Sequence, residues 1–180
     1  MKNLVNVYKI PLLVSITTTI VLVALTTQRE PLTIILMFLI SILTIAVVDL
    51  DYIFHSYFFD QELDFSKNFK TYIKEKSYVK AILYANENEH LIKEKTIHSA
   101  LFQSLFAIFT IFVSFSDANI LLKTGALAVY TNLLYKYIEY SYTKDLEGWF
   151  WAFKIKKFEE VSVFYTTGLI LLLILSLMFI

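Results

Sequence analysis

The sequence contains no cysteine, three glycines, two prolines and a single arginine. Without cysteine, disulfide bonds, thiolate catalysis and cysteine-ligated zinc or iron–sulfur centres are excluded. The shortage of glycine and proline leaves few helix breakers, and no series of short alternating strands is visible, so the chain is predicted to be almost entirely helical. Sixteen basic residues balance sixteen acidic ones, so a concentrated basic surface for nucleic acid is not expected.

Apolar residues make up 57% of the chain, more than the roughly 45–50% of a soluble domain. They are concentrated in blocks that predict about five transmembrane helices, at residues 10–27, 32–55, 97–115, 120–135 and 161–180. Between these blocks lie a predicted cytoplasmic helical segment at 60–95 and an interfacial aromatic segment at 136–158. The predicted fold is therefore all-α, a single multi-pass domain in the cell (inner) membrane.

Local signals place the ends of several predicted helices. Pro31 suits the first turn of the second span. Within 60–95, Phe69 and Ile73 belong to the apolar stripe of one amphipathic helix, and Ser77 is positioned to cap a second. No breaker separates this second helix from the end of the third span, so we expect one continuous helix there.

The distribution of basic residues predicts the orientation of the chain. If the N-terminus is cytoplasmic, the inner segments carry two lysines before the first span, seven in 60–95 and five in 136–158. The outer turns then carry only Arg29 and Lys123. Because basic residues accumulate on the cytoplasmic side, the N-terminus is predicted inside and the C-terminus outside.

All three histidines fall between residues 49 and 98, on the predicted cytoplasmic side. On one continuous helix, four potential metal ligands would share a stripe within an arc of about 80°: Glu87, His90, Glu94 and His98. Asp51 and His55 are spaced i, i+4 near the cytoplasmic end of the second span, at the same membrane level. Facing helices that supply carboxylates and imidazoles are how helical bundles build metal sites.

The predicted metal ligands are Asp51, His55, Glu94, His98 and His90, and this mixed set suits Zn, Mn or Fe. A metal there lowers the pKa of a bound water and makes a nucleophile at neutral pH. Asp49 and Asp51 are the candidate catalytic carboxylates, with Asp49 orienting a ligand or acting as base. Ionisable groups inside a span are expensive and so point to function.

A purely structural interpretation stays open for the same residues. The segment from Glu87 to Lys95 is so rich in charged residues that some share a stripe by chance. In this interpretation Glu94 pairs with a nearby lysine, His98 lies at the headgroup level, and the two aspartates cap helices or pair with lysines. The aromatic segment likewise acts either as an interfacial anchor or as a loop that supplies a carboxylate from Asp145 or Glu147.

Two short runs carry a family resemblance: Val48-Asp49-Leu50-Asp51 at the end of one span and His98-Ser99-Ala100-Leu101-Phe102 at the start of another. They resemble the LexA-binding, inner-membrane metal-dependent hydrolase family, which carries Asp-x-Asp-His, His-Arg-Gly-x-Thr-His-Ser and a later His and Asp. The resemblance implies that Asp49, Asp51 and His98 are metal-site residues. Tyr52 and Lys93 stand where two histidines of the family belong, and the fourth span has no histidine.

Two functions are therefore predicted as alternatives. The first is a metal-dependent hydrolase at the cytoplasmic membrane interface, acting on a lipid or membrane-proximal substrate. The second is a non-catalytic membrane scaffold or subunit that docks a protein partner, or another copy of itself, through the 60–95 helices and the aromatic segment.

Overall fold

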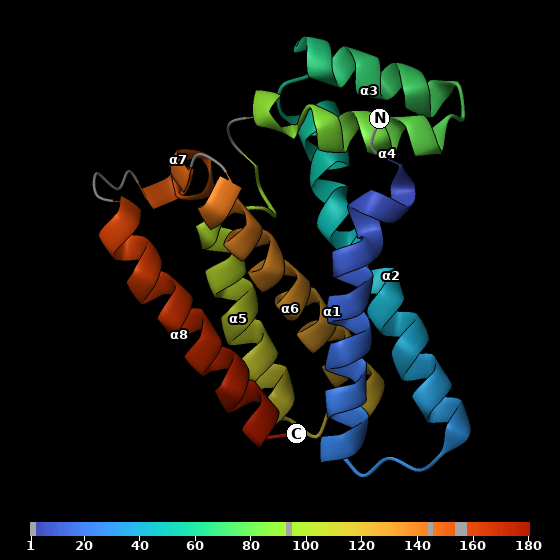
Figure 1. The fold of residues 1–180 in the computed structure, drawn as a ribbon, viewed down its shortest axis with the longest axis vertical. Helices are drawn as coiled ribbons and strands as arrows, with labels where there is room; N and C mark the ends of the chain where they lie inside the picture. Colours follow the sequence, from blue (N-terminus) through green and yellow to red (C-terminus); the bar gives the residue numbers. More distant parts are fainter. Residues whose placement is uncertain (1–2, 93–94, 144–145, 154–157) are drawn as a thin grey trace.

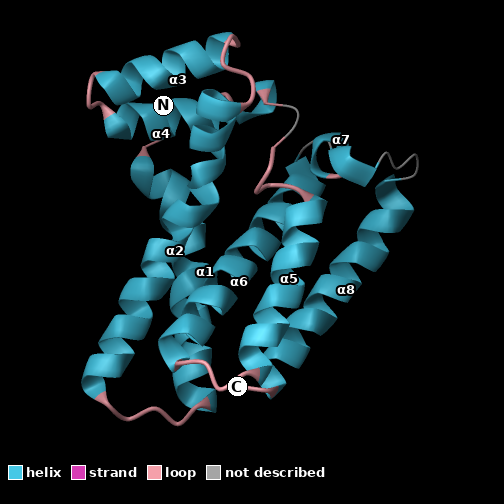
Figure 2. Cartoon of the chain, turned by 180° about the vertical axis from the view of Figure 1, so that it is seen from behind, coloured by secondary structure: helices cyan, strands magenta, loops and turns pink. Residues whose placement is uncertain are grey.

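The computed structural model covers residues 1–180 and describes all of them except 1–2, 93–94, 144–145 and 154–157. The described residues form helices joined by short turns and contain no β-strand (Figure 2). The predicted all-α fold is therefore confirmed.

The long helices of the described chain run up and down side by side (Figure 1). They are α1 (Leu4–Leu25), α2 (Pro31–Phe58), α5 (Ala100–Phe115), α6 (Ile120–Thr143) and α8 (Phe158–Met178). Short helices lie at one end of this bundle, beside the N-terminus: α3 (Asp64–Lys74), α4 (Tyr78–Glu87), the 3₁₀ helix η1 (Glu89–Leu91), α7 (Leu146–Trp149) and the 3₁₀ helix η2 (Trp151–Phe153). The α1–α2 turn and the C-terminus lie at the opposite end.

Capping residues set the start of three long helices. The side chain of Asn3 accepts a hydrogen bond from the backbone N–H of Asn6 (3.0 Å) at the start of α1. Pro31 occupies the first turn of α2, as the sequence predicts. Ser99 caps α5, where its hydroxyl accepts from the N–H of Phe102 (3.3 Å). The third apolar block therefore becomes helical at residue 100 and not at residue 97.

Three helices are long and apolar enough to cross a membrane: α1, α2 and the Glu160–Met178 part of α8. The apolar helix α5 is shorter, with 16 residues. Large apolar side chains are exposed on the outer faces of the bundle, among them Leu43 (68%), Phe112 (70%) and Phe164 (80%). A soluble monomer rarely exposes such side chains over a wide surface, whereas lipid accommodates them. These features identify a membrane protein.

Small polar side chains join the helices in the interior of the bundle. The hydroxyl of Thr19 in α1 donates to that of Ser41 in α2 (2.6 Å), and both residues are fully buried. The hydroxyls of Thr18 in α1 and Thr131 in α6 are 3.0 Å apart. Small residues allow close approach of helices in a membrane, and their hydroxyls add interhelical hydrogen bonds. Helix α2 packs against α1 and α6 in this way, while α5 packs against α6 and α8.

Much of the aromatic segment at 136–158 packs inside the chain. Tyr137 and Tyr140 of α6 contact Trp149 of α7, with ring centroids 5.4 and 5.2 Å apart. Phe150 joins them and stacks edge-on against Tyr165 of α8 at 5.2 Å. The buried rings join α6, α7 and α8, so they are not available to a docking partner.

The expectation of one continuous helix from residue 78 to 115 is wrong. Helix α4 ends at Glu87, one 3₁₀ turn follows, and the described residues from Ile92 to Ser99 are not helical. As a result Glu87, His90 and His98 do not share a helical stripe. The two amphipathic helices at 60–95 are present as α3 and α4, which pack against each other and α3 against α2.

Candidate functional site

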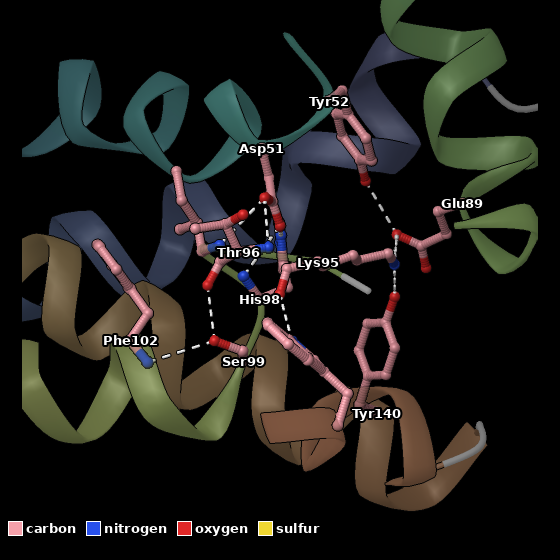
Figure 3. A network of polar contacts seen from close by, with 11 residues as sticks. Asp51, Tyr52, Glu89, Lys95, Thr96, His98, Ser99, Phe102 and Tyr140 are labelled. Atoms are coloured by element: carbon pink, nitrogen blue, oxygen red, sulfur yellow. Dashed lines mark hydrogen bonds and ion pairs between the residues drawn. The ribbon is translucent and has the colours of Figure 1, made fainter. Parts of the chain in front are cut away.

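The polar site at the end of the bundle is built around Asp51. This residue lies on the buried face of α2 and is 1% exposed. Its Oδ1 accepts the backbone N–H groups of Thr96 (2.9 Å) and Ile97 (3.0 Å). Its Oδ2 accepts the backbone N–H of His98 (2.9 Å) and a hydrogen bond from Nδ1 of the same residue (2.8 Å) (Figure 3). The carboxylate thus holds the segment in front of α5 against α2.

These four bonds explain the break between α4 and α5. A carboxylate offers about four acceptor positions, and here each oxygen accepts two hydrogen bonds. The N–H groups of residues 96–98 point at Asp51, so they cannot donate to carbonyls of a preceding helical turn. A buried charge is expensive unless it is hydrogen-bonded, and this arrangement supplies those bonds.

The bond to Asp51 also fixes the state of the His98 ring. Because Asp51 accepts from Nδ1, the proton of the neutral imidazole lies on Nδ1 and Nε2 keeps its lone pair. Burial lowers the pKa of His98 below its usual value, against the opposing effect of the Asp51 carboxylate. The ring is therefore neutral near pH 7. Among the described residues, no hydrogen-bond partner lies within reach of the buried Nε2.

A second buried network adjoins this pair. The hydroxyl of Tyr52 donates to Oε2 of Glu89 (2.9 Å), which lies 3.8 Å from Nζ of Lys95. The same ammonium group is hydrogen-bonded to the hydroxyl of Tyr140, and the backbone carbonyl of Lys95 accepts from Nε1 of Trp151 (2.8 Å) (Figure 3). The segment between α4 and α5 is therefore tied to α2 on one side and to the α6–α7 region on the other.

Lys95 is only 4% exposed, and this burial changes its protonation. Desolvation lowers the pKa of Lys95 to about 7, with Lys136 acting in the same direction and Asp51 and Glu139 opposing. The ammonium group therefore sheds its proton near neutral pH in the folded protein.

The remaining predicted site residues lie apart from this arrangement. Asp49 accepts a hydrogen bond from the hydroxyl of Tyr8 on a different face of α2. His55 is buried, with its Nε2 3.7 Å from Oδ2 of Asp60. His90 is exposed on η1. Glu94 and Asp145 lie outside the described residues, and Glu147 is exposed.

The described residues do not fit the predicted Zn, Mn or Fe site. Among them, no three His, Asp or Glu side chains lie close enough together to hold a metal ion. Asp51 already uses its acceptor positions, so it would have to give up a hydrogen bond in order to bind a metal. The described geometry makes Asp51 the residue that orients His98, and the metal ligands stay a prediction.

Sequence reasoning missed the residues of the second network: Tyr52, Glu89, Lys95 and Tyr140. Tyr52 stood out only as a departure from a motif. Lys95 and Tyr140 are 45 residues apart in the chain, and nothing local pairs them. The single available signal is that Lys95 directly precedes an apolar block, where a lysine is commonly solvated.

A groove of about 610 Å³ runs beside the site, a volume in the range of small-molecule pockets. Its walls include Phe58 and Asp60 at the end of α2, Phe102 of α5, and Trp151. Thr96 and Ser99 also line it, so the groove borders the segment that Asp51 holds.

The fold and the site together define an all-helical membrane protein with a buried Asp–His pair at one end of its helices. Comparisons with models of protein families, with curated proteins and with solved structures found no match for this chain. The family resemblance of the two motifs therefore stays a prediction.

Replacing Asp51 by alanine should destabilise the protein by about 3–5 kcal/mol, because three backbone N–H groups and His98 lose their buried acceptor. The free energy of unfolding in detergent checks this. The matched change Asp117→Ala, at an exposed turn, should cost less than about 0.5 kcal/mol. Equal stability of the two variants would contradict the role given to Asp51.

Lys95 should make stability rise with pH. The unfolded chain holds the lysine proton up to about pH 10.4, whereas the folded protein loses it above about 7. Between these values the unfolded state binds more protons, so stability increases as pH rises, by up to about 1.4 kcal/mol per pH unit. Unfolding measured from pH 7 to 9.5 should show this rise in the wild type and in Lys76→Met, an exposed control. The rise should be absent from Lys95→Met, and equal slopes in all three proteins would refute it.

Proposed function

We propose that the chain is a five-span membrane protein, with a cytoplasmic N-terminus, that hydrolyses a lipid or membrane-proximal substrate at its cytoplasmic face. His98 is the group that activates water, and Asp51 orients it. The observation that carries this proposal is the buried Asp51–His98 hydrogen bond of 2.8 Å, which leaves Nε2 of His98 with a lone pair.

The arrangement of the five long helices supports the topology. Helices α5 and α6 lie alongside α1, α2 and α8 and run between the same two ends of the bundle (Figure 1). The 16 residues of α5 measure about 24 Å, somewhat less than the roughly 30 Å hydrocarbon core. The end that carries α3, α4 and α7 also carries most of the lysines, which favours placing it in the cytoplasm.

The natural absence of cysteine allows a direct test of this topology. Single cysteines at Lys76, Arg29 and Asp117 lie at exposed positions in the α3–α4, α1–α2 and α5–α6 turns. In intact cells, a membrane-impermeant thiol reagent should label Arg29→Cys and Asp117→Cys but not Lys76→Cys. Lys76→Cys should react after the cells are permeabilised. Labelling of Lys76→Cys in intact cells would contradict the orientation.

The chemistry of the pair suits general-base catalysis. A neutral imidazole whose other nitrogen is held by a carboxylate accepts a proton efficiently near neutral pH. A water molecule at Nε2 of His98 would give its proton to that nitrogen while its oxygen attacks the carbonyl carbon or phosphorus of an ester. The proton would then pass from Nε2 to the oxygen of the leaving alcohol. No metal ion takes part in this proposal, because the described residues do not fit one.

The groove beside the pair suits an amphiphilic substrate. Phe58, Leu101, Phe102 and Leu105 make its apolar wall, while Asp60, Thr96 and Ser99 are polar. His98 itself is fully buried behind Thr96 and Ser99, so catalysis includes a local opening that brings Nε2 to the groove.

A non-catalytic role is the second candidate, and one observation favours it. Asp51 uses its acceptor positions to hold the segment before α5, and the adjoining network of Tyr52, Glu89, Lys95 and Tyr140 is buried as well. Groups that serve only to join helices have this character. In that case the two networks stabilise a membrane scaffold, and loss of His98 affects stability alone.

Hydrolysis can be tested with the purified protein in mixed micelles that contain fluorogenic phospholipids, beside a p-nitrophenyl acyl ester. His98→Ala should lower the rate by about 100-fold or more, because general-base catalysis contributes 10²–10⁴-fold. His90→Ala is the matched control, since this histidine is exposed on η1, and it should keep the wild-type rate.

An unchanged rate in His98→Ala, or a wild type that turns over none of these probes, would favour the scaffold. Metal content measured by ICP-MS separates a further outcome. Near-stoichiometric zinc, manganese or iron that is lost in both His98→Ala and Asp51→Ala would restore the metal site predicted from the sequence.

A further inference from the structure

Pro11 interrupts the hydrogen bonding of α1 next to a small internal pocket. A proline inside a helix has no N–H, so the carbonyl four residues earlier, that of Val7, loses its helical partner. Pro11 is buried, and both residues line a pocket of about 10 Å³. A volume of this size holds one water molecule or one small ion.

An asparagine from α6 lines the same pocket. Asn132 is 2% exposed, and its Nδ2 donates to the hydroxyl of Ser15 (2.9 Å) and to the carbonyl of Ala128 (2.9 Å). Because the Ala128 carbonyl can only accept, these bonds fix the orientation of the amide. Its Oδ1 is buried and has no hydrogen-bond partner among the described residues. A buried acceptor without a partner indicates that something is to be bound there.

The third side of the pocket is Asp49 of α2. Its Oδ2 accepts the hydroxyl of Tyr8, which leaves Oδ1 available. Lys136 also lines the pocket, but its ammonium group is 3.1 Å from Oε2 of Glu139 and is balanced by it. The three side chains together therefore carry one net negative charge, that of Asp49, inside the bundle.

We propose that this pocket binds one dehydrated monovalent cation of about the size of Na⁺, held by the carbonyl of Val7, Oδ1 of Asp49 and Oδ1 of Asn132. Hard cations prefer oxygen ligands, and carbonyls freed from helices coordinate Na⁺ in other membrane proteins. The single uncompensated charge selects a monovalent ion. The ion would join α1, α2 and α6, which lie side by side (Figure 1). This site lies on another face of α2 from Asp51 and does not depend on the hydrolytic proposal.

The test compares thermal unfolding of the detergent-purified protein in NaCl and in choline chloride of equal ionic strength. Saturating Na⁺ should raise Tm by roughly 2–4 °C, because an ion that binds only the folded state stabilises it. Purified protein should also retain ²²Na⁺, and unlabelled Na⁺ should displace it.

Two variants locate the ion. Pro11→Ala restores the N–H that bonds the Val7 carbonyl, so the helix should be at least as stable in choline chloride while the response to Na⁺ is lost. A purely structural role for this region predicts no such separation. Asn132→Leu removes a second oxygen and should also abolish the response. Thr17→Ala, on the exposed face of α1, is the matched control and should respond like the wild type.

Equal Tm in NaCl and choline chloride, without ²²Na⁺ retention, would show that the pocket holds only water and would overturn the proposal. A Na⁺ response that persists in both Pro11→Ala and Asn132→Leu would place the ion elsewhere and would overturn it as well.

Discussion

The buried charge of Asp51 is the constraint on which the rest of this end of the molecule depends. A carboxylate removed from water has to be compensated by hydrogen-bond donors, and α2 itself offers none at this position. The donors come instead from three consecutive backbone N–H groups and one imidazole, at residues 96–98. The chain must leave the helical conformation there in order to supply them, and this separates the α3–α4 pair from the membrane helices.

The same separation makes the second network possible. Once residues 95–99 cross the end of the bundle, Lys95 lies between Glu89 and Tyr140, and its carbonyl meets Trp151. The aromatic rings of α6 and α7 then close over His98, with the ring of Trp149 edge-on at 6.2 Å. The pair is thus enclosed by protein on the side away from the groove. Such enclosure favours a neutral histidine, and it is equally the environment of a structural hydrogen bond.

Two aspartates only two residues apart have unrelated partners. Successive residues of a helix are separated by about 100°, so Asp49 and Asp51 point to different neighbours. Asp51 meets the segment before α5, whereas Asp49 meets Tyr8 of α1 and the pocket formed with Asn132 of α6. Each carboxylate therefore has its own electrostatic task, one in holding a loop and the other in balancing a cation. The resemblance to a metal-dependent hydrolase had assigned both to one site.

The sequence by itself determined the helices. Apolar blocks of sufficient length, Pro31 at a helix start and the amphipathic repeats of α3 and α4 are local signals, because helical hydrogen bonds join residues four apart. Only the tertiary structure decided the partners of the polar groups. The break before α5 has no glycine or proline to announce it, since its cause is a carboxylate 45 residues away. Likewise His90 and His98 are equivalent by helical spacing, yet one is exposed and the other buried, because burial depends on which elements pack over each residue.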